Sequence, residues 1–83
     1  VRHSAHELDI RGLQVHEALP EVERFLDEAF ANGVDAVFLI HGAGTGALRR
    51  AIRDHLRTLP YARSFRPGAH GEGGDGVTIV SLA

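Results

Sequence analysis

The stretch "DAVFLIHGAGTGALRR" (residues 35–50) joins a short apolar run to a helical segment through three alternating glycines, Gly42, Gly44 and Gly46. The apolar run 35–41 is typical of a strand that is buried on both faces. Glycine is costly in regular structure, so three of them indicate a backbone that needs their conformational freedom. The stretch therefore predicts a strand, a tight glycine turn and a helix from about Ala47 to Leu59.

The flanking segments extend this pattern to β-α-β-α-β-β. Residues 7–12 alternate as a strand does, and apolar residues between 15 and 32 recur with the period of an amphipathic helix. Pro20 is expected in the first turn of that helix. Residues 62–68 and 76–82 are expected to form a hairpin, and right-handed crossovers make the first three strands parallel. We therefore expect an α/β fold, a two-layer sandwich of two helices on a mixed four-stranded sheet.

The 83 residues suffice for one domain. Residues 1–6 are expected to be the end of a linker and residues 7–83 a single domain; since the chain begins with Val1, we expect it to belong to a longer protein. The absence of cysteine excludes disulfides and thiolate metal sites. No apolar run reaches the roughly 18 residues of a membrane span, so we expect a cytoplasmic location and no membrane partner.

The basic residues, all nine of them arginine, are unevenly distributed. Residues 42–70 hold six arginines and one acid, whereas residues 12–41 hold one arginine and six acids. The planar guanidinium group matches the geometry of phosphate. This distribution predicts one face that binds an anion.

The candidate site lies at the carboxyl ends of the first two predicted strands, where open α/β sheets bind their ligands. If these strands are neighbours, Asp9 and Arg11 lie near His41. The glycine turn would then offer free amides to an anion, a role that competes with simple close packing. For His41, acid/base chemistry or phosphate binding competes with an orienting role. The other histidines lack metal-ligand spacing as a set, so no metal site is expected, and Glu72 and Asp75 are expected to be solvated.

Three motifs together resemble the small MutS-related (Smr) domain: "LDIRG" (8–12), "HGAGTG" (41–46) and "GEGGDGVTIVSL" (71–82). The last is most similar to the Smr domain at the C terminus of the second bacterial MutS paralogue. The resemblance implies a fold like the C-terminal domain of translation initiation factor three. It also implies DNA nicking linked to suppression of homologous recombination, or messenger-RNA cleavage in ribosome rescue at collided ribosomes. Arg11 stands where many members carry histidine, and arginine cannot act as a base.

We therefore expect a nicking endonuclease domain whose catalytic residues are Asp9, Arg11 and His41. Asp9 and His41 would move protons, while Arg11 would clamp the scissile phosphate. The phosphate would lie on the glycine turn. The expected binding residues are Gly42, Gly44, Thr45, Gly46, Arg49, Arg50 and Arg53.

The expected partners are branched or duplex DNA, RNA or the ribosome, and the parent protein is expected to be a homodimer. No cofactor is expected in this domain, because ATP would bind only in the parent's ATPase domains. A divalent metal could activate water for DNA nicking, whereas RNA carries its own nucleophile in the 2′-hydroxyl. Two alternatives stay open: a non-catalytic module that positions the parent ATPase on DNA or the ribosome, and a protein-interaction domain.

Overall fold

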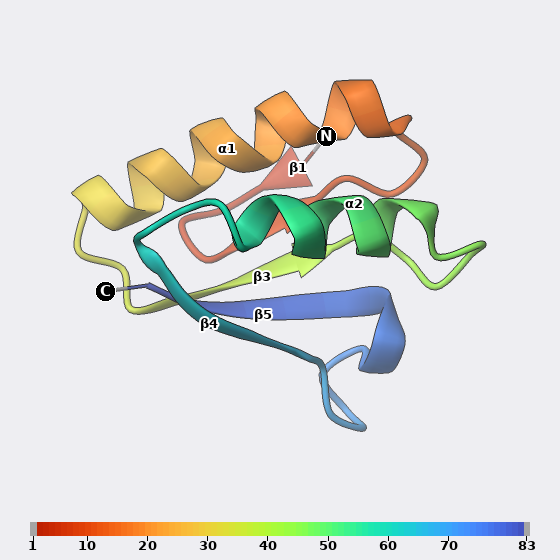
Figure 1. Ribbon diagram of the computed structural model, residues 1–83. Coiled ribbons are helices and arrows are strands. Elements are labelled where there is room, and N and C mark those ends of the chain that lie inside the picture. Colours follow the sequence, from red (N-terminus) through yellow and green to blue (C-terminus); the bar gives the residue numbers. More distant parts are fainter. Residues whose placement is uncertain (1, 83) are drawn as a thin grey trace.

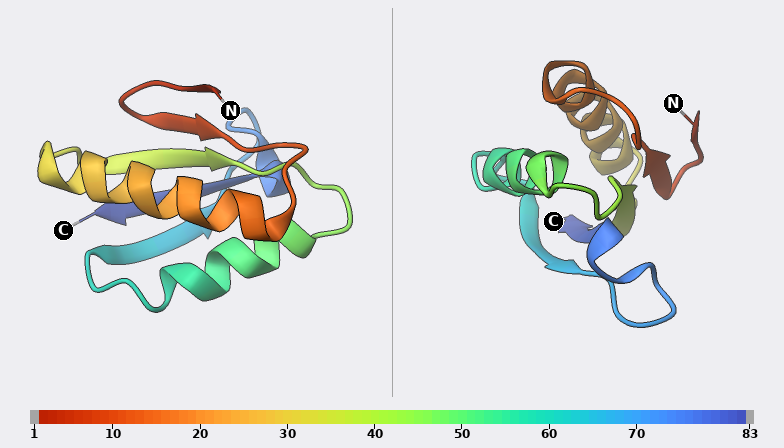
Figure 2. Two further views of the ribbon diagram at one scale, coloured as in Figure 1. Left: turned by 90° about the horizontal axis from the view of Figure 1, so that it is seen from above. Right: turned by 90° about the vertical axis from the view of Figure 1, so that its right-hand side faces the viewer.

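The computed structural model describes residues 2–82; Val1 and Ala83, the outer ends of the expected linker and domain, lie outside this range. The described chain forms one sheet in the order β1-β2-β3-β5-β4, and two helices cover one of its faces (Figure 1 and Figure 2). In chain order the elements are β1 (Arg2–His3), β2 (Glu7–Asp9), α1 (Val15–Ala31), β3 (Ala36–Ile40), α2 (Ala47–Leu56), β4 (Ala62–Pro67), a short 3₁₀ turn (Gly74–Gly76) and β5 (Val77–Leu82).

The predicted two-layer β-α-β-α-β-β sandwich is confirmed over residues 7–82. β2 and β3 are parallel neighbours, and β5 pairs antiparallel with both β3 and β4. β4 therefore runs parallel to β3, as predicted, but β5 lies between them. The apolar β5 suits the centre because most of its side chains are buried. β4 carries Arg63, Arg66 and Pro67, which suit an edge strand.

Part of the expected linker belongs to the sheet instead. β1 pairs antiparallel with β2, with Arg2 opposite Asp9 and His3 opposite Leu8. The sheet therefore has a fifth strand beyond the predicted four. At two residues, β1 is too short to show an alternating pattern in the sequence.

α1 follows the predicted periodicity, but Pro20 lies deeper in it than expected. The helix starts at Val15, which places Pro20 in the second turn rather than the first. Proline has no N–H, so the carbonyl of His16 loses its helical partner. His16 is exposed, and water can satisfy that carbonyl. The buried stripe of the helix consists of Ala18, Val22, Phe25, Leu26 and Ala29.

α2 ends at Leu56, short of the predicted Leu59. Pro60 disfavours a helical backbone in the residue before it, and the N–H groups of Thr58 and Leu59 instead donate to carbonyls three residues back. Ile52 and Leu56 are buried, as predicted for the apolar stripe. Neither α1 nor α2, the helices of the described chain, has the length and apolar character needed to cross a bilayer.

β3 is fully buried on one face only, contrary to the prediction. Val37 and Leu39 are fully buried in the core, whereas Phe38 and Ile40 are half-buried on the opposite face. The reason is that both helices pack on the same face of the sheet (Figure 2). A strand is buried on both sides only where helices cover both faces of the sheet.

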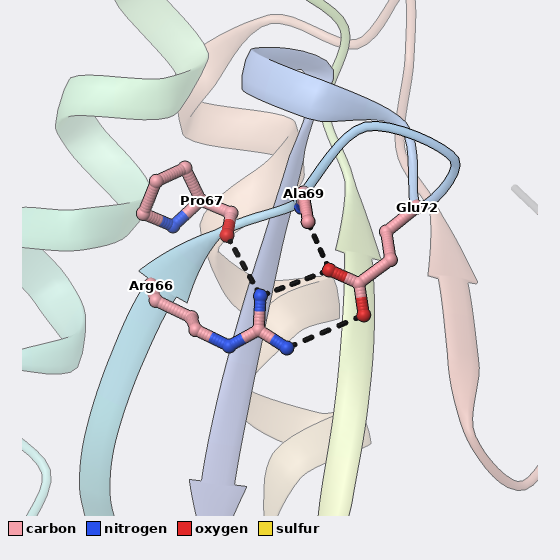
Figure 3. Close-up of polar contacts among 4 residues, drawn as sticks. All are labelled: Arg66, Pro67, Ala69 and Glu72. Carbon is pink, nitrogen blue, oxygen red and sulfur yellow. Dashed lines mark hydrogen bonds and ion pairs between the residues drawn. The ribbon is translucent and has the colours of Figure 1, made fainter.

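The loop between β4 and β5 is held by an ion pair, although Glu72 was expected to be solvated. Arg66 Nη1 and Nη2 donate to Glu72 Oε1 and Oε2 at 2.9 and 3.3 Å, and the Ala69 N–H donates to Oε1 at 2.7 Å (Figure 3). These bonds, chiefly those from Arg66, lower the pKa of Glu72 to about 2. The loop ends at Gly76, whose carbonyl accepts the N–H groups of His41 and Gly42. The ordered loop therefore lies against the glycine turn.

Candidate functional site

The carboxyl ends of β2 and β3 meet at one rim of the sheet. The Ile10 N–H donates to the Ile40 carbonyl at 2.9 Å, which continues the parallel ladder beyond Asp9. A Cβ atom placed on Gly42 would lie 3.5 Å from Arg11 Cγ. The two sequence motifs, far apart along the chain, are therefore in contact at this rim.

The glycine turn (residues 41–46) presents a run of amide groups. Gly42, Gly44 and Gly46 have φ angles of +81°, +32° and +84°, while Ala43 and Thr45 between them have negative values. Such alternation directs successive N–H groups to one side and forms a concave nest for anions. Within residues 2–82, the amides of residues 43–46, 48 and 49 have no hydrogen-bond acceptor. We call these the open amides.

Two guanidinium groups fold over the turn. A Cβ atom on Gly46 would lie 2.9 Å from Arg49 Nη2 and 3.3 Å from Arg50 Nη1. Neither arginine side chain makes a hydrogen bond or ion pair within the described chain. Cations in the first turn of a helix oppose its dipole, so an anion on the turn would stabilise both charges.

The turn forms one wall of a groove of about 460 Å³. Residues 41–48 line this wall and residues 12–15 line the opposite one. The N-terminal ends of α1 and α2 therefore both border the groove, and their partial positive charges favour an anion there. The wall of residues 12–15 was not predicted from the sequence. The signal was Gly12, which separates a strand from a helix as the glycine turn does.

The predicted site residues separate into two groups. His41, Gly42, Gly44, Thr45 and Gly46 line the groove. Asp9, Arg11 and the three α2 arginines contribute no part of its lining; Arg11 touches the turn at Gly42, while Arg49 and Arg50 lie over Gly46. The groove therefore lies between the glycine turn and residues 12–15, and arginine side chains contact the turn beside it.

Asp9 and Arg11 form a tight ion pair. Asp9 Oδ1 accepts the Arg11 backbone N–H at 3.1 Å and its Nε–H at 3.0 Å, and Oδ2 accepts Nη2–H at 2.6 Å. The Asp9 side chain is 15% exposed and that of Arg11 is 57% exposed. The hydrogen bond and the charge of Asp9 raise the pKa of Arg11. Asp9 therefore fixes the orientation of the Arg11 guanidinium group, while much of the Arg11 side chain stays exposed to solvent.

His41 is buried, and both its ring nitrogens are engaged inside the protein. Its Nδ1–H donates to the Gly42 carbonyl at 2.8 Å, and Nε2 lies 2.8 Å from Thr78 Oγ1. Burial lowers the pKa of His41; the charges of Arg53 and Arg49 act in the same direction, while the bond to Gly42 opposes them. A neutral ring with no nitrogen open to the groove favours the orienting role over acid/base chemistry.

Asp9 and His41 share the rim but leave the sheet on opposite faces. Leu8 and its partner Leu39 are buried in the core, so Asp9 and Ile40, the next pair, point to the other face. His41 follows Ile40 and bonds Thr78, which pairs with Leu39. The expected neighbourhood of Asp9 and His41 is therefore a shared edge and not a shared pocket.

A metal centre made only of protein side chains has no donor set in the described part of the chain. No three His, Asp or Glu side chains gather closely enough there to hold an ion. A substrate phosphate could supply further oxygen ligands, as it does for Mg²⁺ in many enzymes.

The buried His41 should make folding stability sensitive to mild acid. Because burial lowers its pKa below the ordinary 6.5, the unfolded chain takes up this proton at a higher pH than the folded one. His41 should therefore contribute full stability above pH 6.5 and lose it as the pH falls towards the folded value. Urea unfolding between pH 5 and 8 should show this slope, and His41→Asn, which can still donate to the Gly42 carbonyl, should flatten it. The ion pair of Glu72 with Arg66 changes its contribution to stability only between pH 4.5 and about pH 2, below the range of this experiment. An equal slope in both proteins would contradict the assignment.

Comparison with known proteins gives consistent matches. A family model described as "Smr domain" matches residues 8–83. A protein named Endonuclease MutS2 from Anaeromyxobacter sp. (strain Fw109-5) is 56% identical over 75 residues, which cover 90% of this chain and 9% of that protein. Its namesake from Pelotomaculum thermopropionicum is 55% identical over 82 residues, covering 99% of this chain and 10% of that protein. The chain therefore spans only a small part of these relatives.

Two solved structures have the same fold. The Smr domain of Thermus thermophilus MutS2 superposes with a TM-score of 0.92 at 52% identity, over 94% of this chain and 98% of that one. YdaL, a stand-alone small MutS-related protein from Escherichia coli, superposes with a TM-score of 0.90 over 96% of this chain and 66% of that one. At 23% identity, this second likeness shows the fold alone.

Proposed function

Because the chain belongs to the Smr domain family, we propose that it is the nucleic-acid-binding nicking endonuclease domain of a MutS-like protein. The family matches confirm the resemblance that the three motifs predicted. The similar full-length relatives are named as endonucleases, which supports a nuclease-associated role. Cutting by this domain, and the choice between DNA and RNA, belong to the proposal.

One observation carries the proposal: the open amides lie beside Arg49 and Arg50, two cations that have no partner within residues 2–82. A phosphodiester offers such a cluster two non-bridging oxygens that share one negative charge. Hydrogen bonds to charged groups contribute about 1.5–3 kcal/mol each. A few of them would hold a nucleic-acid backbone on the turn without any contact to a base.

Arg11 and Asp9 supply the groups for chemistry at the adjoining rim. Arg11 would hold the scissile phosphate and stabilise the negative charge that develops in the transition state. Asp9, bound to Arg11 at 2.6 Å, would accept the proton of the attacking group. His41 would keep the turn in shape, since its ring nitrogens are engaged by Gly42 and Thr78.

The two candidate substrates differ in what else they require. RNA carries the 2′-hydroxyl as an internal nucleophile, so a base and a phosphate clamp suffice. DNA needs an activated water, which a divalent metal commonly supplies. DNA nicking would fit a role in suppressing homologous recombination, and RNA cleavage would fit a role at collided ribosomes.

A cleavage assay on supercoiled plasmid and on structured RNA tests the proposal, with each substrate incubated in Mg²⁺ and in EDTA. Nicked plasmid in Mg²⁺ alone would indicate metal-activated water. RNA fragments ending in a cyclic phosphate, formed in EDTA as well, would indicate attack by the 2′-hydroxyl. If neither substrate is cut under either condition, the endonuclease proposal is wrong.

The second candidate function is a binding module without catalysis, which would position a parent ATPase on DNA or the ribosome. The burial of His41 and the pairing of Asp9 with Arg11 favour it. This module would bind nucleic acid through the open amides but leave cleavage at background. Nucleic-acid binding by the wild-type protein, with cleavage no higher than that of Asp9→Asn, would select it.

A further inference from the structure

Thr78 is a buried polar residue near the start of β5, within the motif of residues 71–82, to which no role has yet been given. Its side chain is fully buried, and it lies between two site residues from other elements. Thr78 Oγ1 is 2.8 Å from His41 Nε2 and 3.1 Å from Arg53 Nε. A buried hydroxyl with two such partners links β5 to the glycine turn and to α2.

The position of each hydrogen in this cluster follows from chemistry. The Gly42 carbonyl can only accept, so His41 Nδ1 carries the hydrogen of their 2.8 Å bond. A neutral ring then has a bare Nε2, which accepts the Thr78 hydroxyl hydrogen. Arg53 Nε can only donate, so it occupies a lone pair of the same hydroxyl. The order of donation is therefore Arg53 to Thr78, Thr78 to His41, and His41 to the Gly42 carbonyl.

This chain of bonds sets the orientation of the Gly42–Ala43 peptide group in the glycine turn. The carbonyl and the following N–H of a trans peptide point in opposite directions, and none of the described peptide bonds is cis. With the Gly42 carbonyl directed at the His41 ring, the Ala43 N–H must point away from it. Ala43 is the first of the open amides, so its direction depends on the tautomer of His41.

Arg53 is held in this cluster at a cost. Its Nη2 is buried without a hydrogen-bond partner in the described chain, and burial and the charge of Arg49 lower its pKa. A buried donor left unpaired is unfavourable, because it has lost its hydrogen bonds to water. The contact that Arg53 gains is the one to Thr78, which keeps the hydroxyl hydrogen directed at His41.

We propose that Thr78 is a positioning residue: oriented by Arg53, its hydroxyl holds His41 in the Nδ1–H tautomer and so turns the amide of Ala43 towards the anion. The effect on nucleic-acid binding rests on the proposed function. The effect on the tautomer does not, because it depends only on contacts inside the folded chain.

The test compares Thr78→Val, which removes the hydroxyl at nearly the same volume, with Thr78→Ser, which keeps it. The ¹⁵N chemical shifts of the His41 ring report the tautomer, and titration with a labelled DNA duplex and a single-stranded RNA reports binding. We expect wild type and Thr78→Ser to hold the hydrogen on Nδ1. In Thr78→Val we expect a population with the hydrogen on Nε2 and affinity lower by about tenfold, the scale of one lost charge-linked hydrogen bond.

The outcomes separate the two proposals. A Thr78→Val protein that keeps the Nδ1–H tautomer overturns the positioning role, as does one with a changed tautomer and undiminished affinity. If wild type binds neither nucleic acid, the proposed function fails and the ring shifts alone decide the role of Thr78. Should Thr78→Val fail to fold because Arg53 Nε is stranded, the double variant Thr78→Val/Arg53→Met removes that buried charge. It is compared with the single variant Arg53→Met, so that the loss of this arginine is common to both proteins.

Discussion

Replacing Asp9 with asparagine should reduce cleavage by about 10²–10⁴-fold, the range for loss of a positioned acid or base. Asparagine retains an oxygen for the Arg11 backbone N–H, which Asp9 Oδ1 accepts at 3.1 Å. It loses the negative charge that accepts a proton and pairs with the guanidinium group. Single-turnover cleavage of the preferred substrate, at saturating protein, measures this effect on the chemical step.

The control for this substitution is Asp54→Asn on α2. Asp54 also pairs with an arginine, Arg57, at 2.6 Å, but its side chain is 76% exposed. Both variants raise the net charge equally, so nonspecific attraction for nucleic acid changes alike. Asp9→Asn should bind at least as tightly as wild type, since Arg11 is no longer neutralised. Cleavage by Asp9→Asn at the rate of Asp54→Asn would remove Asp9 from the mechanism and favour the binding module.

The fold could be predicted from the sequence because the patterns of its separate segments are consistent with one arrangement. The period of residues 15–32, the glycines of the turn and the apolar run before it each fix one element, and crossover handedness then leaves few arrangements. The position of β5 between β3 and β4 could not be predicted from any one segment of the sequence. It depends on which of the two strands, β4 or β5, has more apolar side chains on both of its faces. β1 is stabilised only by pairing with β2, which no local pattern reveals.

The backbone arrangement of the candidate site could be predicted from the sequence. Adjacent strand ends bring Arg11 against Gly42, and the positive φ angles of the turn follow from its glycines. The side-chain network was not predictable. Thr78 reaches His41 across 37 positions of sequence, and the faces of Asp9 and His41 depend on the register Leu8–Leu39, which pairing alone defines.

These differences change the chemical interpretation of the motifs. Sequence spacing made His41 a partner of Asp9 in proton transfer, whereas burial and two internal hydrogen bonds make it part of the scaffold of the turn. The rim therefore separates two tasks. In the proposed function, backbone amides and the α2 arginines would hold the anion. The Asp9–Arg11 pair, whose arginine is the exposed member, would act on it.

Removing Arg49 and Arg50 together should weaken nucleic-acid binding by about tenfold to a hundredfold at low salt, the scale of losing charge-assisted contacts. Their guanidinium groups lie at Gly46, over the open amides. Each phosphate contact contributes about 0.9 to the slope of log K against log salt on duplex DNA, so the double alanine variant should lower that slope by about 1.8. Binding titrations at several salt concentrations give both quantities. Folding should be intact, because neither side chain has a hydrogen-bond or ionic partner within residues 2–82.

The double variant Arg24→Ala/Arg63→Ala is the matched control, since it removes the same charge from other places. Arg24 pairs with Glu21 on α1 at 2.6 Å, and Arg63 is exposed on β4. If the nucleic-acid backbone lies on the glycine turn, this control should bind with nearly the slope of wild type, because long-range attraction is screened within about 10 Å at 0.1 M salt. Equal slopes for the two double variants would mean that only net charge matters, and that the open amides are not where the phosphate binds.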